Sequence, residues 1–145
     1  MIEIDGTFGE GGGQILRTSL SLAAITGQAV HFVNIRAKRR KPGLMRQHLA
    51  CVKATTEITS GNVSGAELNS RELTFEPGTI HGGDYRFVVG TAGSVMLIAQ
   101  TVIPVLLRAD APSRVEIEGG THVDQAPIFE FFDRVYLPAL RKMGA

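Results

Sequence analysis

The glycine-rich segment at positions 9–14, Gly-Glu-Gly-Gly-Gly-Gln, lies between a strand-like run and a helical pattern. Glycines allow a backbone to approach a ligand closely, and the N-terminus of a following helix offers free N–H groups and partial positive charge. This order therefore indicates a phosphate site. The segment lacks the Gly-Lys-Ser/Thr ending of a Walker loop, and Gln14 stands where a dinucleotide fingerprint needs glycine. A tight turn without a ligand remains the alternative.

Glu10 lies inside this loop with a glycine on each side. A carboxylate next to a phosphate would be repelled unless a divalent cation lay between the two groups. The functional interpretation is therefore a Mg²⁺ or Mn²⁺ ion that bridges Glu10 and the phosphate. The alternative is an exposed loop glutamate, which the dipole of the following helix would favour.

Three arginines are candidates for binding the same phosphate. Arg17 follows Gln14 by one turn of the expected helix, so both side chains flank the glycine loop. Arg36 and Arg39 follow the next expected strand, which should lie beside the first. Because a guanidinium binds phosphate through two parallel hydrogen bonds, the three arginines together could hold a terminal phosphate or a triphosphate.

Charge is distributed unevenly along the chain, although the formal net charge is only +1. No Asp or Glu occurs between Glu10 and Glu57, an interval rich in Lys and Arg. A solvated basic loop is the usual explanation of such a run, but the lack of balancing acid favours contact with an RNA or DNA backbone. No aromatic residue interleaves the run, so base stacking is not indicated there. The candidate RNA-binding residues are Lys38, Arg40, Lys41 and Arg46.

Two polar residues follow the basic run on the first turn of an expected helix. Gln47 could donate a hydrogen bond to phosphate or to a base, and His48 is interpreted as a surface or structural histidine. Cys51, among apolar residues, is interpreted as a buried structural thiol. The remaining histidines have neither metal-ligand spacing nor a serine or cysteine partner, so no role is assigned to them.

Hydrophobic periodicity and turn residues predict the elements that carry these side chains. Helices are expected at 14–25, 44–59, from about 94 to 107, and at 128–143 with an interruption at Pro138. Strands are expected at 2–5, 29–35, 63–68, 72–75, 84–89 and 115–117.

The order strand, glycine loop, helix, strand, loop, helix occurs twice, with the second copy shifted by roughly eighty residues. We expect an α/β (α+β) sandwich of repeated units, each a sheet of about four strands with two helices on one face. Residues 1–85 would form the first unit and residues 86–145 an incomplete second one. The strands expected after the second unit are missing, which suggests a fragment or a partner that supplies them.

Composition is typical of one soluble domain, with 145 residues of which 43% are hydrophobic and 20% charged. No charged-then-apolar signal segment opens the chain, and no apolar run is long enough to span a bilayer. No membrane partner and a cytoplasmic location are therefore expected.

Several stretches together resemble the N-terminal part of the RNA 3′-terminal phosphate cyclase family. The resemblance covers essentially all 145 residues, but less than half of a full-length family member. The stretches are Asp5-Gly6, Gly9 to Arg17, Ile35-Arg36-Ala37 with Arg39, Lys41 to Leu44 with Arg46 to Leu49, Gly82 to Phe87, Gly93-Ser94 with Gln100 to Val102, and Gly119 to Thr121 with Ala126-Pro127.

The resemblance implies an ATP-dependent enzyme that converts an RNA 3′-phosphate into a 2′,3′-cyclic phosphate, through an adenylylated histidine and an RNA adenylate. It implies that Glu10 matches a glutamate tied to the metal and to the ATP phosphates. It also implies that Gln100 contacts ATP, and that Pro127 and Phe131 lie near the adenine. The polar residues that match positions around the phosphates of ATP and of the RNA end are Gln14, Arg17, Arg36, Arg39 and Gln47. The family fold repeats a four-stranded sheet with two helices, akin to units of the enolpyruvyl transferases.

The chain departs from the family in one respect that matters for catalysis. The nucleophilic histidine of the family lies near its C-terminus, and none of the histidines here falls on the matching position. We therefore expect that this chain forms no AMP adduct alone, and that a missing C-terminal half or a second copy of the chain is a partner.

Two rival interpretations share the same fold. A non-catalytic relative that binds RNA in ribosome assembly would not need a metal-phosphate carboxylate, so the combination of Glu10, Arg17, Arg39 and Gln100 favours the enzyme. A sugar-phosphate enzyme of the enolpyruvyl transferase type would share the repeat, but the segment 9–14 points elsewhere.

Overall fold

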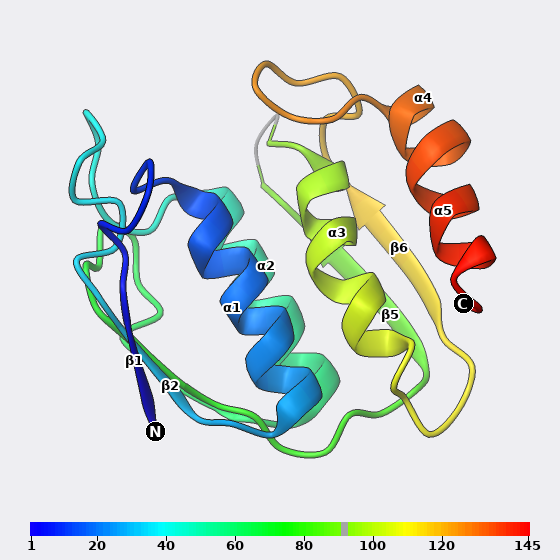
Figure 1. Cartoon of the computed structure of the whole chain (residues 1–145), viewed down its shortest axis with the longest axis horizontal. Coiled ribbons are helices and arrows are strands. Elements are labelled where there is room, and N and C mark those ends of the chain that lie inside the picture. Colours follow the sequence, from blue (N-terminus) through cyan, green and yellow to red (C-terminus); the bar gives the residue numbers. More distant parts are fainter. Residues whose placement is uncertain (91–92) are drawn as a thin grey trace.

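The computed structural model describes residues 1–90 and 93–145, and it shows an α+β protein (Figure 1). A four-stranded sheet has the order β1-β2-β4-β3, in which β1 and β2 are parallel and the other neighbours are antiparallel. Its strands are β1 (Ile2–Asp5), β2 (Val30–Val33), β3 (Asn62–Ser64) and β4 (Leu73–Glu76).

Helices α1 (Gly13–Thr26) and α2 (Arg46–Thr59) lie between this sheet and α3 in Figure 1. Each helix buries a stripe of mostly apolar and small residues, as its periodicity predicts. Helix α1 ends at Gly27, whose φ of 68° is the left-handed conformation expected of a glycine C-cap.

The second part of the chain contains a two-stranded parallel sheet of β5 (Asp84–Val88) and β6 (Arg114–Glu118). Helix α3 (Val95–Leu106) connects these strands and also packs against α1 and α2. The order β5-α3-β6 therefore reproduces the parallel order β1-α1-β2, which supports the internal repeat inferred from the sequence. The unit boundaries at 1–85 and 86–145 stay a prediction.

The last helical stretch is continuous, contrary to the expected interruption at Pro138. It runs through α4 (Phe129–Phe131), the π-helical turn η1 (Phe132–Tyr136) and α5 (Leu137–Lys142). Proline lacks an N–H group, and its ring crowds the carbonyl four residues earlier. The chain accommodates Pro138 by widening the preceding turn to the π form, with the proline in the first turn of α5.

Three expected boundaries were too long, each for a local reason. β2 ends at Val33 because the next residue, Asn34, turns the chain with a φ of 54°. β3 ends at Ser64, before Gly65 with its φ of 77°. Helix α2 begins at Arg46, because Met45 before it is extended.

A single apolar core joins the two parts of the chain. Ser21 on α1 donates a hydrogen bond of 2.7 Å to the carbonyl oxygen of Thr101 on α3. The Thr101 hydroxyl lies 3.6 Å from the sulfur of Cys51 on α2. Cys51 is fully buried, and burial raises the pKa of its thiol to about 11. The interpretation of Cys51 as a buried structural thiol is confirmed.

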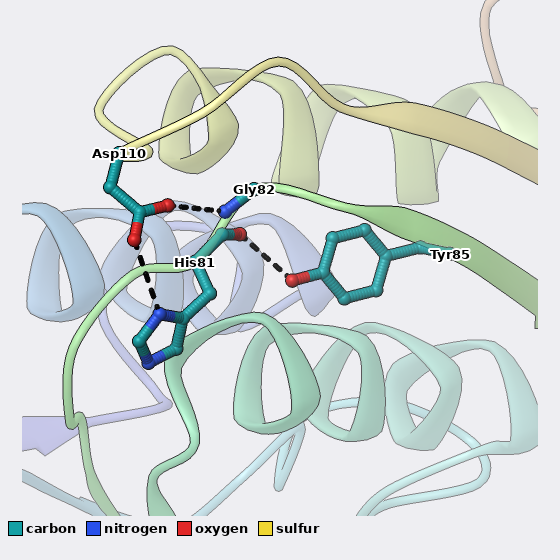
Figure 2. A network of polar contacts seen from close by, with 4 residues as sticks. All are labelled: His81, Gly82, Tyr85 and Asp110. Atoms are coloured by element: carbon teal, nitrogen blue, oxygen red, sulfur yellow. Dashed lines mark hydrogen bonds and ion pairs between the residues drawn. The ribbon is translucent and has the colours of Figure 1, made fainter.

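A polar network ties the segment before β5 to the loop between α3 and β6 (Figure 2). The Asp110 carboxylate accepts a 2.8 Å bond from the Gly82 N–H group and lies 3.4 Å from the His81 ring. The Tyr85 hydroxyl donates a 2.8 Å bond to the His81 carbonyl oxygen. The hydrogen bond from the Gly82 N–H group, with a smaller contribution from His81, lowers the pKa of Asp110 below its usual value.

Across residues 1–90 and 93–145, none of the helices is both long and apolar enough to cross a lipid bilayer.

Candidate functional site

A cavity of about 920 Å³ lies where the glycine loop (residues 9–14), the basic loop (residues 36–43) and the N-terminus of α2 meet. The glycine loop connects β1 to α1, and the basic loop follows β2. Because β1 and β2 are parallel, both loops leave the same edge of the sheet. The charged and polar side chains lining the cavity are Glu10, Gln14, Arg17, Arg36, Arg39, Arg40, Lys41, Gln47, His48, Asp124 and Gln125.

The glycine loop presents the backbone of α1 to this cavity. Gly9 and Gly11 have φ values of 60° and 59°, a conformation that residues with a Cβ rarely adopt. Gly12 is the N-cap of α1, and no side chain hydrogen-bonds to the first turn from this position. The N-terminal N–H groups of α1 therefore face the cavity without a side-chain cap, which suits an anion.

Two glycines of the loop also leave room for neighbouring side chains. A Cβ atom on Gly13 would overlap the His48 ring and lie 2.9 Å from Nη1 of Arg17. A Cβ atom on Gly12 would lie 2.8 Å from Nη2 of Arg39. The glycines thus allow a histidine and two arginines to lie directly against the start of the helix.

Arg17 is buried at the back of the cavity, with only 8% of its surface exposed. Its Nη2 atom donates a 2.9 Å hydrogen bond to Oε1 of Gln14, one turn earlier. Its Nε atom is buried and has no hydrogen-bond partner among the described residues. Burial lowers the pKa of the Arg17 guanidinium. A buried, incompletely paired guanidinium is costly, and an anion would compensate it.

Arg36 lines the cavity, but part of its guanidinium is hydrogen-bonded within the basic loop. Its Nη1 atom donates 2.8 Å hydrogen bonds to the carbonyl oxygens of Lys41 and Gly43. A guanidinium has five N–H groups, so three lie outside these two bonds. Burial, with a smaller contribution from Arg39, lowers the pKa of Arg36. Arg36 therefore shapes the basic loop as well as facing the cavity.

Glu10 and Arg39 form an ion pair of 3.1 Å. The Glu10 side chain is 91% exposed and the Arg39 side chain 41% exposed, so both remain accessible from solvent. Glu10 brings a negative charge into a lining that is otherwise mostly basic. Among the residues that the structure describes, no three His, Cys, Asp or Glu side chains are grouped as metal ligands.

His48 is buried at the start of α2, and its Nδ1 atom accepts a 3.1 Å hydrogen bond from the Met45 N–H group. Burial, and then the nearby charges of Arg36 and Arg17, lower its pKa from 6.5 to about 3. The ring is therefore neutral at physiological pH, and its hydrogen bond to the backbone gives it a structural role. Gln47, on the same first turn, lines the cavity as a half-buried side chain.

One wall of the cavity contains residues that were not among the expected site residues. It consists of Val123 to Ala126, in the loop between β6 and α4, and includes Asp124 and Gln125. Gln125 has a φ of 60°, so the loop turns sharply there. No local pattern marks this segment as part of a phosphate site, because its position depends on how the second part of the chain packs against the first.

Other candidate residues lie outside the main cavity. Gln100 lines a small separate cavity of about 20 Å³, which Gln14 and Arg17 also line. Pro127 follows directly after the wall segment, and Phe131 is an exposed residue of α4. Lys38 and Arg46 are exposed and are not part of the lining. Their functional roles stay predictions.

The fold and the cavity define an α+β protein with a basic, glycine-lined site at the start of a helix. The chain matches the RNA 3′-terminal phosphate cyclase family over residues 8–145, and it belongs to that family. A curated relative from Ectopseudomonas mendocina (strain ymp), named RNA 3′-terminal phosphate cyclase, is 55% identical over 144 residues. The match covers 99% of this chain and 42% of the relative, so the chain spans less than half of the relative's length.

Proposed function

We propose that this chain supplies the phosphate-binding half of a site for the ATP-dependent cyclisation of an RNA 3′-phosphate to a 2′,3′-cyclic phosphate. The observation that carries the proposal is the convergence of Glu10, Arg17 and Arg39 on one cavity at the N-terminus of α1. Family membership and the relative's name support the reaction type.

The donor set of the cavity fits phosphate better than a neutral ligand. The buried Arg17 Nε–H group has no partner among the described residues, and the first N–H groups of α1 lack a side-chain cap. Arg39 and the uncommitted N–H groups of Arg36 add charge-assisted donors. A phosphate oxygen accepts several such bonds at once, so one phosphate would satisfy groups that are otherwise costly to bury.

Glu10 fits a divalent cation only in combination with a bound phosphate. Mg²⁺ is usually held by one or two carboxylates together with phosphate oxygens and water. Glu10 would supply one carboxylate oxygen after release from Arg39, and the guanidinium would then turn to the phosphate. When bound, the cation neutralises phosphate charge and so favours nucleophilic attack on phosphorus.

ATP is the proposed activating substrate, because a phosphate oxygen is a poor leaving group until it is joined to AMP. The residues of this chain would bind and orient the phosphates rather than form the covalent bond. His48 is poorly placed as a nucleophile, since its Nδ1 atom is engaged and its low pKa makes the ring a weak base. We expect no stable label on the purified chain after incubation with labelled ATP and Mg²⁺.

Binding of a short single-stranded RNA tests the proposal. Fluorescence anisotropy with 3′-phosphorylated and 3′-hydroxyl forms of the same sequence should show that the phosphate improves affinity by about tenfold or more. Inorganic pyrophosphate should displace the phosphorylated form. Equal affinity of the two forms, with no displacement, would favour a general RNA-binding protein over a cyclase site.

A further inference from the structure

Phe8 is an exposed aromatic side chain directly before the glycine loop, two residues before Glu10, which lines the cavity. It is 80% exposed, a value that only Met143 near the C-terminus exceeds among the described large apolar residues. Single exposed apolar residues are common on protein surfaces and need no function by themselves. The surroundings of Phe8 are what make it unusual.

The turn that carries Phe8 is fixed by hydrogen bonds on both sides. The Asp5 carboxylate accepts a 2.9 Å bond from the Thr7 N–H group. The Phe8 N–H group donates to the Asp5 carbonyl oxygen at 3.2 Å, and the Phe8 carbonyl oxygen accepts from the Gly11 N–H group at 3.1 Å. The aromatic ring is therefore presented by an ordered turn, two residues before Glu10.

The basic loop lies directly beside this turn. Lys38 donates a 2.9 Å hydrogen bond from Nζ to the Thr7 carbonyl oxygen, and the two loops run side by side in Figure 1. The Lys38 side chain also lies against Gly11. Arg40 and Lys41 are exposed on the same loop. The sequence showed no aromatic residue within the basic run, but folding places one next to it.

We propose that Phe8 stacks on a base of a single-stranded RNA whose 3′-phosphate occupies the cavity. This inference rests on the proposed function, because it needs the RNA end to be held beside Glu10 and Arg39. An aromatic face next to a row of cations is the combination that binds single-stranded nucleic acid without sequence preference. The basic loop contacts the RNA backbone, and Phe8 contacts the base of a nucleotide near the 3′ end of the RNA.

The charge around Phe8 favours this occupant over an apolar protein partner. The exposed neighbours Lys38, Arg40 and Lys41 carry like charge and would be costly to bury against an apolar surface. An RNA strand brings phosphate to the cations and a π-face to the ring at the same time. Binding through Phe8 should therefore need bases as well as phosphates.

Tryptophan fluorescence gives a direct test, because the chain contains no tryptophan. A Phe8→Trp variant would be a single-tryptophan protein whose emission should be quenched by a 3′-phosphorylated RNA. Inorganic pyrophosphate, which has no base, and an oligomer with abasic residues next to its 3′-phosphate should leave the emission unchanged. Leu22→Trp, on the exposed part of α1, is the matched control and should not respond to the RNA.

Affinity measurements complete the test. Phe8→Ala should weaken binding of the 3′-phosphorylated RNA by about 5- to 150-fold, and Phe8→Tyr should bind as the original chain does. Pyrophosphate affinity should be the same in all three proteins.

If Phe8→Ala binds RNA normally and the Phe8→Trp emission is not quenched, the stacking inference is wrong while the cavity assignment stands. If the original chain binds the phosphorylated RNA no better than its 3′-hydroxyl form, the stacking inference and the cavity assignment are both wrong. Quenching by an added protein but not by RNA would identify a protein-docking residue instead.

Discussion

The Nη2 atom of Arg39 lies 3.1 Å from Oε2 of Glu10, although 29 positions separate the two residues in the chain. They meet because Glu10 follows β1, Arg39 follows β2, and the two strands are parallel neighbours. The ion pair thus joins the glycine loop to the basic loop at the cavity. An exposed pair of this kind contributes only about 0–1 kcal/mol to stability, so its importance lies in the site.

Replacing Glu10 by Gln should remove the Mg²⁺ dependence of ATP binding without unfolding the chain. The amide keeps the size of the side chain but is a poorer ligand for a hard cation. Calorimetric titration with ATP should show that Mg²⁺ strengthens binding to the original chain and has little effect on the variant. Glu67→Gln, an exposed glutamate away from the cavity, should behave as the original chain. A Mg²⁺ effect that survives in Glu10→Gln would contradict the metal assignment.

Replacing Arg17 by Met should weaken pyrophosphate binding and leave stability equal or higher. A charge-assisted hydrogen bond contributes about 1.5–3 kcal/mol, which corresponds to roughly a 10- to 150-fold loss of affinity. A buried charge replaced by an apolar side chain of similar length is often neutral or stabilising. Calorimetry and urea unfolding measure the two quantities, with the exposed Arg108→Met as control. A large loss of stability with unchanged affinity would make Arg17 a structural residue.

His48 should make the stability of the chain depend on pH below neutrality. Its pKa is about 3 in the folded chain against 6.5 for an unperturbed histidine, so the unfolded state binds more protons between these values. Stability due to the neutral ring is complete above pH 6.5 and is lost as pH falls towards 3, by about 2 kcal/mol between pH 7 and pH 5.

The matched variant for this effect is His48→Asn, whose side-chain oxygen can still accept the Met45 N–H bond but does not titrate. Urea unfolding at pH 7 and pH 5 should show that the variant loses less free energy of unfolding than the original chain. Identical losses in the two proteins would mean that His48 is not the group responsible.

Gly13→Ala should damage the site more than Gly12→Ala. At Gly13 the new methyl group would overlap the buried His48 ring, whereas at Gly12 it would meet the end of the flexible Arg39 side chain. Overpacking against a buried group costs about 1–3 kcal/mol. Urea unfolding should give Gly13→Ala the lower midpoint, and pyrophosphate titration should give it the lower affinity. The reverse order would show that the His48 ring moves aside more easily than its burial implies.

The elements that carry the site were predictable because their signals are local. The glycine loop, the apolar stripe of α1 and the Gly27 cap all occur within a few residues of the feature they define. The convergence of Arg36 and Arg39 on the glycine loop was also predictable, because neighbouring parallel strands end at one edge of a sheet.

The remaining parts of the site depend on tertiary packing, which the sequence pattern does not report. Asp124 and Gln125 reach the cavity only because the second part of the chain packs against the first, which brings the loop after β6 to the glycine loop and the start of α2. The burial of His48 depends on how α2 packs, and the hydrogen bond from Lys38 to Thr7, beside Phe8, joins two loops that are distant in the sequence. The strand ends at Asn34 and Gly65 were missed because positive φ values at single residues are weak signals.

The Arg17 Nε–H group offers the most direct test of the phosphate site, since it is buried in the cavity wall and has its own signal in a ¹H–¹⁵N NMR spectrum. Titration with inorganic pyrophosphate should shift this signal and the Gly13 amide signal together, with one dissociation constant. The exposed Arg108 Nε–H signal should stay in place. If the Arg17 and Gly13 signals do not move, or if they move only along with those of exposed arginines such as Arg108, this cavity does not bind phosphate.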